Sequence, residues 1–271
     1  MSTPLPELRH FSIRVDGSVA ILSYDLPRTG NSLKYAVLKS MLEAMRWATA
    51  DPTIRVIVQT GTGKFFTTGR DMEGGQSDSS AGDLPSAIEM FRQLNDSLII
   101  CPKVLIAAVN GPAAGYGVTS LALYDLVYSV PDAYFFTPFS KWALCPEGCS
   151  SVTFPAIMGH QKAAALLIAG DRMSASELCD AGLVTKILGA EGFLEEVLKT
   201  AHKIAAYPPK ALAQSKGLIN ASRREELLEA NRRECECLAG LVVQDECIEA
   251  VLQFAQEQER KKAAGGKKSR L

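Results

Sequence analysis

The chain has 271 residues, of which 47% are hydrophobic and 22% are charged, and its formal net charge is −1. This length suits one large domain, or one domain with a helical extension, and the composition is ample for a buried core. A net charge near zero provides no field that would attract nucleic acid or a membrane surface. No segment approaches the roughly 20 apolar residues of a membrane-spanning helix. Neither nucleic acid nor a membrane is therefore expected as a partner.

The seven cysteines are an odd number and include no Cys-x-x-Cys pair. This usage predicts a reducing compartment and no metal site. The first ten residues carry two prolines but no apolar run, so no secretory signal is expected. Basic residues gather near the C-terminus, where we expect a solvated tail.

Strand and helix patterns alternate through the first half of the chain, which favours an α/β core. An Asp-Gly turn at residues 16–17 joins the first two strands in a hairpin. The expected strands are 11–15, 19–24, 54–58, 104–109, 126–130 and 134–137, and the expected helices are 33–49, 86–100 and 117–124.

The second half of the chain is mainly helical. Ser174 and Glu177 form a capping-box pattern that opens a short helix ending at Gly182. A last short strand is expected at 184–188. A helix follows Pro208-Pro209, and residues 223–260 predict one long helix or a pair.

Glu147 is the first candidate catalytic residue. Between residues 133 and 158 the only other charged side chain is Lys141. Burying an unpaired carboxylate costs several kcal/mol, and such a group responds with a raised pKa. A raised carboxyl can shuttle a proton near neutral pH. The alternative interpretation is a carboxylate that interacts with the dipole of a helix beginning near Ser150.

Two glycine-bearing loops each follow a strand. Gly69, in the loop 65–72, allows the backbone to kink so that the next amide points into a pocket. Asn110–Gly117 leads into an apolar helix, whose first amides lack intrahelical acceptors and suit an oxyanion. For the Gly69 loop the alternative is an ordinary surface turn, and this is the better interpretation if the loop is taken alone. For Asn110–Gly117 the alternative is a tight strand–helix turn that requires small residues.

Several common catalytic and nucleotide-binding motifs are absent. Gly115-x-Gly117 does not continue as a dinucleotide-binding motif, because Ser120 stands where the third glycine would be. No phosphate-binding P-loop and no Gly-x-Ser-x-Gly motif occur, and the three histidines lack the framework of a hydrolase triad.

The last three residues, Ser269, Arg270 and Leu271, resemble the peroxisomal address Ser-Lys-Leu. They predict a peroxisomal location and an import receptor as a partner. The alternative is a solvated basic terminus.

Three segments resemble the crotonase (enoyl-CoA hydratase/isomerase) superfamily: the Gly69 loop, Asn110–Gly117 and Cys145–Ser151. The resemblance covers roughly residues 11–254. It is greatest to the peroxisomal Δ3,Δ2-enoyl-CoA isomerases, which also end in such an address. It implies a core spiral of ββα units over residues 1–200 and a helical oligomerisation region over 201–260. It also implies a homotrimer or hexamer. The basic composition and the glycines of residues 261–271 predict a flexible tail there.

The resemblance implies an acyl-CoA thioester as substrate, with coenzyme A as part of it and no separate cofactor or metal. The backbone amides of Arg70 and Tyr116 would hold the thioester oxygen, and Glu147 would be the base. The residues that would line the path of the coenzyme A and the thioester are Thr68, Gly69, Arg70, Asp71, Met72 and Tyr116.

Hydratases of this superfamily use two glutamates, and the matching positions here are Thr119 and Phe139. Neither side chain can move a proton at neutral pH. The resemblance therefore implies an isomerase of fatty acid β-oxidation, converting cis- or trans-3-enoyl-CoA to trans-2-enoyl-CoA by a one-base shift from C2 to C4. Hydratase-type activity and non-catalytic acyl-CoA binding are the alternatives.

Overall fold

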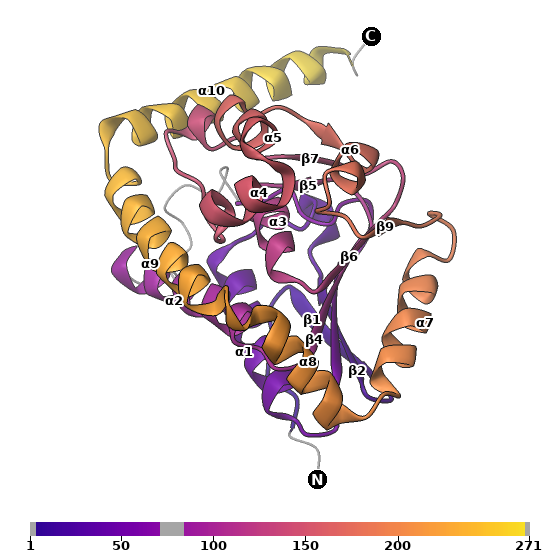
Figure 1. Ribbon diagram of the computed structural model, residues 1–271. Coiled ribbons are helices and arrows are strands. Elements are labelled where there is room, and N and C mark those ends of the chain that lie inside the picture. The colour runs from indigo at the N-terminus through magenta and orange to yellow at the C-terminus, as the bar shows by residue number, and fades with distance from the viewer. Residues whose placement is uncertain (1–3, 71–83, 269–271) are drawn as a thin grey trace.

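The structure, a computed structural model, describes residues 4–70 and 84–268 (Figure 1). Its main sheet has the strand order β1-β2-β3-β4-β6-β9, antiparallel between β1 and β2 and parallel elsewhere. A smaller sheet has the order β5-β7-β8. The strands are β1 Phe11–Asp16, β2 Val19–Tyr24, β3 Val56–Gly61, β4 Val104–Val109, β5 Ala113–Ala114, β6 Leu126–Ser129, β7 Tyr134–Phe136, β8 Met173–Ser174 and β9 Lys186–Ile187.

Helices follow most strands and make up the C-terminal third. The α-helices are α1 Tyr35–Ala50, α2 Leu84–Ile99, α3 Tyr116–Thr119, α4 Ser150–Met158, α5 His160–Ala164, α6 Ala175–Asp180, α7 Phe193–Ala205, α8 Pro209–Ala221, α9 Arg224–Leu241 and α10 Asp245–Lys268. The shorter turns are the 3-10 segments η1 Pro27–Thr29, η2 Ser120–Leu123 and η3 Ser140–Trp142, and the π-helical segment η4 Ala165–Ala169. None of the helices in the described part of the chain is both long enough and apolar enough to span a bilayer.

The main sheet is covered on both faces, which explains its apolar strands. Figure 1 shows the sheet between α7 on one side and α1, α2 and α8 on the other. All six residues of β4 are buried, as expected for a parallel strand between two helical layers. Helix α1 turns an apolar face to the sheet, with Val37, Met41 and Met45 almost completely buried.

The α/β fold predicted from the sequence is confirmed, with differences at element ends. Helix α1 begins at Tyr35 rather than at residue 33, because Leu33 pairs with Arg70 in an isolated bridge and its amide donates to the Gly69 carbonyl over 2.8 Å. The predicted C-terminal helical tract is a pair, α9 and α10. Helix α10 continues to Lys268.

The two C-terminal helices return to the core at different places. Helix α9 runs along α2, and α10 crosses the top of the molecule in Figure 1, where it contacts η3. Phe254 of α10 packs edge-on against Trp142 of η3, with ring centroids 4.8 Å apart. Because η3 lies just before Glu147, both helices pack close to the segment that carries it.

The two glycine-bearing loops are hydrogen-bonded to each other. Phe66 N donates to Pro112 O over 3.1 Å, and Ala114 N donates to Thr67 O over 3.0 Å. A Cβ added to Gly111 would lie only 2.0 Å from the Lys64 carbonyl oxygen. The loops can approach this closely only because position 111 has no side chain.

We therefore predict that Gly111→Ala lowers the free energy of unfolding by about 1–3 kcal/mol, the usual range for forcing extra volume into a packed site. Gly217→Ala in α8 is the matched control, because nothing lies within 4 Å of the added Cβ. This control gains helix propensity and should be stabilised by up to about 1 kcal/mol. Urea unfolding measures both, and an equal effect of the two substitutions would contradict the close approach at Gly111.

Candidate active site

The backbone around Arg70 is set by Gly69. Gly69 has a φ of +78°, and a Cβ at this position would lie 2.9 Å from the Ala114 carbonyl oxygen. Its amide donates to Thr67 Oγ1 over 3.1 Å, and its carbonyl accepts from Leu33 N. Among the described residues, no acceptor pairs with the Arg70 amide that follows. This kink therefore leaves an N–H group available beside the second loop.

The backbone around Tyr116 has a corresponding form. Gly115 has a φ of +54° and precedes α3, and its own amide donates to Phe136 O over 3.0 Å. The Tyr116 amide is the first of the helix and has no acceptor within the described part of the chain. Gly117 lies so close to Thr67 that an added Cβ would be 2.2 Å from Thr67 Cγ2. The loops that carry the two unpaired amides are thus in direct contact.

The side chain of Tyr116 points into the core. It is 3% exposed, and its hydroxyl donates to Asn95 Oδ1 of α2 over 2.7 Å. Asn95 in turn donates to Asn231 Oδ1 of α9 over 2.9 Å, and Phe91 packs edge-on against the tyrosine ring. The side chain anchors α3, so the backbone amide is the part of Tyr116 that can meet a ligand.

Glu147 lies in the loop between η3 and α4, close to α3. A Cβ added to the next residue, Gly148, would lie 3.0 Å from Thr119 Oγ1, which shows how near this loop comes to that helix. The Glu147 carbonyl accepts from Ser150 N and Oγ, over 3.2 and 2.7 Å. In the described residues no hydrogen-bond donor contacts its side-chain carboxyl group. The local backbone is therefore fixed while the carboxyl remains available.

The electrostatics of Glu147 suit a group that gains and loses a proton. Burial raises the pKa of its carboxyl to about 7, the charge of Arg70 lowers it, and the charge of Glu234 raises it. Desolvation outweighs the attraction of the nearby cation. The arrangement can therefore accept a proton near neutral pH next to two unpaired amides.

The alternative role considered for Glu147, a carboxylate at the start of a helix, belongs to Glu234. One oxygen of Glu234 accepts from Cys149 N over 2.6 Å and the other from Ser151 N over 2.9 Å, at the N-terminus of α4. The sequence interpretation missed this residue. The available signal was its position seven residues after Leu227 and four before Leu238, on the apolar face of α9.

The remaining candidates are spread around the first loop. Thr68 is exposed, and its amide donates to Gly30 O over 2.9 Å. Asp71 and Met72 lie outside the described residues.

The two positions that match hydratase glutamates, Thr119 and Phe139, are both buried and carry no ionisable group.

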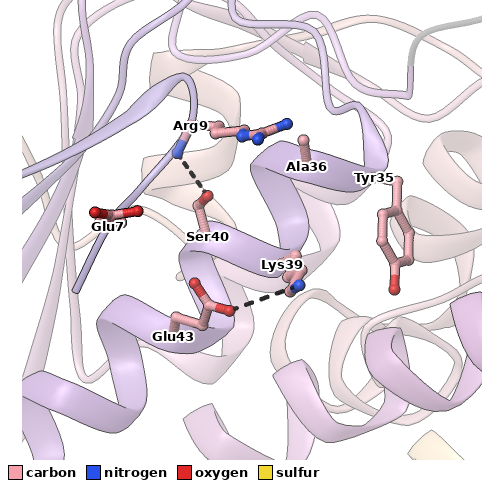
Figure 2. Close-up of a pocket in the computed structure, with 7 residues that line it drawn as sticks. All are labelled: Glu7, Arg9, Tyr35, Ala36, Lys39, Ser40 and Glu43. Atoms are coloured by element: carbon pink, nitrogen blue, oxygen red, sulfur yellow. Dashed lines mark hydrogen bonds and ion pairs between the residues drawn. The ribbon is translucent and has the colours of Figure 1, made fainter. Parts of the chain in front are cut away.

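A separate pocket of about 270 Å³ lies between the segment before β1 and helix α1 (Figure 2). It is polar, and the Arg9 amide donates across its edge to Ser40 Oγ over 2.9 Å. None of the candidate residues above lines it. Its lining is Glu7, Arg9, Tyr35, Ala36, Lys39, Ser40 and Glu43.

Several known proteins are similar in sequence to this chain. The model of the enoyl-CoA hydratase/isomerase family matches residues 14–263. Enoyl-CoA delta isomerase 2 of Homo sapiens is 37% identical over 243 residues, which cover 88% of this chain and 61% of the relative. The peroxisomal enoyl-CoA delta isomerase 3 of Mus musculus is 31% identical over 255 residues, with 92% and 78% covered. The chain thus spans less than two thirds of the human relative's length.

Solved structures agree with this match. A crystal structure of an enoyl-CoA hydratase/isomerase from Pseudoalteromonas atlantica superposes with a TM-score of 0.84 at 30% identity, over 92% of this chain and 98% of that one. The expected crotonase fold with its helical C-terminal region is therefore confirmed. Taken with the family model and the curated relatives, these similarities establish that the chain belongs to the enoyl-CoA hydratase/isomerase family.

Proposed function

We propose that this protein isomerises 3-enoyl-CoA, cis or trans, to trans-2-enoyl-CoA, with Glu147 as its single proton shuttle. The observation that carries the proposal is the carboxyl of Glu147, which has a pKa of about 7 and no hydrogen-bond donor among the described residues. The names of the human and mouse relatives, which are enoyl-CoA delta isomerases, support the same reaction.

In the proposed reaction the thioester acidifies the C2 protons of the substrate, and Glu147 removes one of them. Negative charge then develops on the thioester oxygen, where the Arg70 and Tyr116 amides donate hydrogen bonds. One donor of this kind is typically worth about 3–4 kcal/mol in the transition state. Glu147 returns the proton at C4, which completes the shift and leaves the enzyme as it began.

Substrate binding is the second part of the proposal. Residues 68–72 and Tyr116 would follow the pantetheine and the thioester, since the loop backbone of Gly69 and Arg70 leads directly to the free amide. The guanidinium of Arg70 is exposed and lies near enough to Glu147 to lower its pKa. The coenzyme A enters as part of the substrate, and the proton shift uses no further cofactor or metal.

Hydration of 2-enoyl-CoA is the competing enzymatic function. It needs a second acid–base group to activate water, and Thr119 and Phe139 stand at the positions that match the hydratase glutamates. One carboxylate suffices for a proton shift between two carbons of the same substrate if the chain is held across it. The acid–base residues thus favour isomerisation. A non-catalytic acyl-CoA-binding protein would bind the thioester without turnover.

The setting proposed for this reaction is fatty acid β-oxidation in the peroxisome, by a homotrimer or hexamer. The name of the mouse relative includes the word peroxisomal. The terminal Ser269, Arg270 and Leu271 lie outside the described residues, and their sequence is the basis for proposing an import receptor as a partner.

The reaction is tested with purified protein and 3-hexenoyl-CoA or 3-decenoyl-CoA, following the absorbance of the conjugated enoyl thioester, beside a hydration assay with 2-enoyl-CoA. We expect 2-enoyl product from the 3-enoyl substrates and no hydration. Hydration alone would favour the competing function. Binding of acyl-CoA without turnover in either assay would favour the non-catalytic one.

Glu147→Gln is expected to lower kcat by at least about 10²–10⁴-fold, the range contributed by a positioned acid–base group, while acyl-CoA binding is retained. Glu195→Gln, an exposed glutamate of α7, is the matched control and should keep wild-type turnover. Near-native turnover of Glu147→Gln would remove this residue from the mechanism.

The same variant should be more stable than the wild type at high pH. The pKa of Glu147 is raised from 4.5 to about 7 in the folded state. The protonated side chain therefore stabilises the folded state relative to the ionised one. This contribution is fully present below pH 4.5 and is lost as the pH rises through 7. At pH 8 we expect the free energy of unfolding of Glu147→Gln to exceed that of the wild type by about 3 kcal/mol. This difference should decrease towards pH 4. Urea unfolding at both pH values measures it, and a gain independent of pH would contradict the raised pKa.

Deleting Ser269–Leu271 from a chain tagged at its N-terminus is expected to move the protein from peroxisomes to the cytosol. Fluorescence microscopy against a peroxisomal marker measures the change. Replacing Lys267 and Lys268 by alanine is the control, because it removes basic charge but keeps the address. An unchanged punctate pattern after the deletion would rule out the address.

A further inference from the structure

The carboxylate of Glu234 is buried directly behind the loop that carries Glu147. Glu234 belongs to α9, which is separated by more than 80 residues from the loop it contacts, and it is 6% exposed. Its two oxygens accept from the amides of Cys149 and Ser151, over 2.6 and 2.9 Å. A buried carboxylate that accepts two amide hydrogen bonds is a strong and directional support.

The loop needs such a support because its backbone is strained. Gly148 and Cys149 both have positive φ values, +64° and +63°. The second is costly for a residue with a side chain. Cys149 Sγ also donates to the Leu227 carbonyl of α9 over 3.3 Å. Without the carboxylate of Glu234, the Cys149 and Ser151 amides would both lose their acceptor, the first of them in the buried interior, and the strained turn would lose these two hydrogen bonds.

A neighbouring residue of α9 reaches the other half of the site. Asn231 lies one turn before Glu234 and accepts from Asn95 Nδ2 over 2.9 Å, and Asn95 accepts from the Tyr116 hydroxyl over 2.7 Å. Asn231 also donates to Asp96 Oδ1 over 2.8 Å. One turn of α9 therefore fixes both the helix that begins at the Tyr116 amide and the loop of Glu147.

We propose that Glu234 is a positioning residue for the proton shuttle: its carboxylate holds the Glu147 loop in place and supplies the negative charge that faces the Glu147 carboxyl. This inference rests on the proposed function for the role of Glu147. Glu234 does not touch the reacting atoms in this scheme, and acts only through the loop and the electric field at Glu147.

The charge of Glu234 acts on Glu147 in a defined direction. Glu234 raises the pKa of Glu147 and Arg70 lowers it, so removing the negative charge should lower that pKa. Burial raises the pKa of Glu234 itself, whereas the amides that it accepts from and the charge of Arg233 lower it. The titratable groups that face Glu147 are Arg70, Tyr116, Cys145, Glu234 and Cys235.

Two substitutions separate the position of the carboxylate from its charge. Glu234→Asp keeps the charge but is one methylene shorter, so it cannot reach both amides. Glu234→Gln keeps the length but loses the charge, and it has one accepting oxygen where the carboxylate uses two. Glu226→Gln, an exposed glutamate on the same helix, is the matched control.

We expect Glu234→Asp to lower kcat by about 10²-fold, the effect of a misplacement of about 1 Å, with KM little changed and the pH profile at its wild-type position. Glu234→Gln should lower kcat and move the acidic limb of the profile to lower pH. Glu226→Gln should match the wild type. A purely structural role would lower the folded fraction without moving the profile, and wild-type kcat and pH profile in folded Glu234→Gln would overturn the proposal.

An NMR titration of the glutamate side-chain carboxyl carbons tests the electrostatic half without turnover. The Glu147 signal is identified by its absence from the spectrum of Glu147→Gln. The pH midpoint of its titration should be lower in Glu234→Gln than in the wild type and unchanged in Glu226→Gln. An unmoved midpoint would refute the coupling. A protein without isomerase activity that still shows the shift would instead overturn the proposed function and leave the link between the two glutamates standing.

Discussion

The site depends on the desolvation of one carboxyl group. Glu147 is placed where burial raises its pKa to about 7 although the cation of Arg70 is close enough to oppose that rise. A carboxyl without a hydrogen-bond donor in the surrounding described residues destabilises the folded chain whenever it is ionised. The fold must supply that free energy elsewhere, and the buried parallel sheet with helices on both faces is the evident source.

Close backbone contacts between the two glycine-bearing loops leave two amide groups without hydrogen-bond acceptors among the described residues. Gly69 and Gly115 adopt conformations that favour glycine, and Gly111 and Gly117 allow the two loops to touch. The N–H groups that follow, those of Arg70 and Tyr116, therefore lie on adjoining loops without acceptors in the part of the chain that is described. Preorganised donors of this kind stabilise a developing oxyanion without reorganisation, which is what the proposed proton shift requires.

Local sequence signals predicted the elements that depend on local causes. The strand and helix alternation, the lone carboxylate at position 147 and the glycine loops could all be recognised from residues close together in the chain. The start of α1 could not, because the bridge between Leu33 and Arg70 competes with the first helical turn. Glu234 was missed for the same kind of reason: its role exists only once α9 packs against the start of α4, a contact between segments 85 residues apart.

The most direct test of the account is the fate of a label at C2. In the proposed reaction one carboxyl group carries the same proton from C2 to C4 before that proton exchanges with water. With 3-decenoyl-CoA deuterated at C2, mass spectrometry of the 2-enoyl product formed in ordinary water should find part of the deuterium at C4. Product that forms readily but never carries label at C4 would contradict direct transfer of the same proton by one carboxyl group.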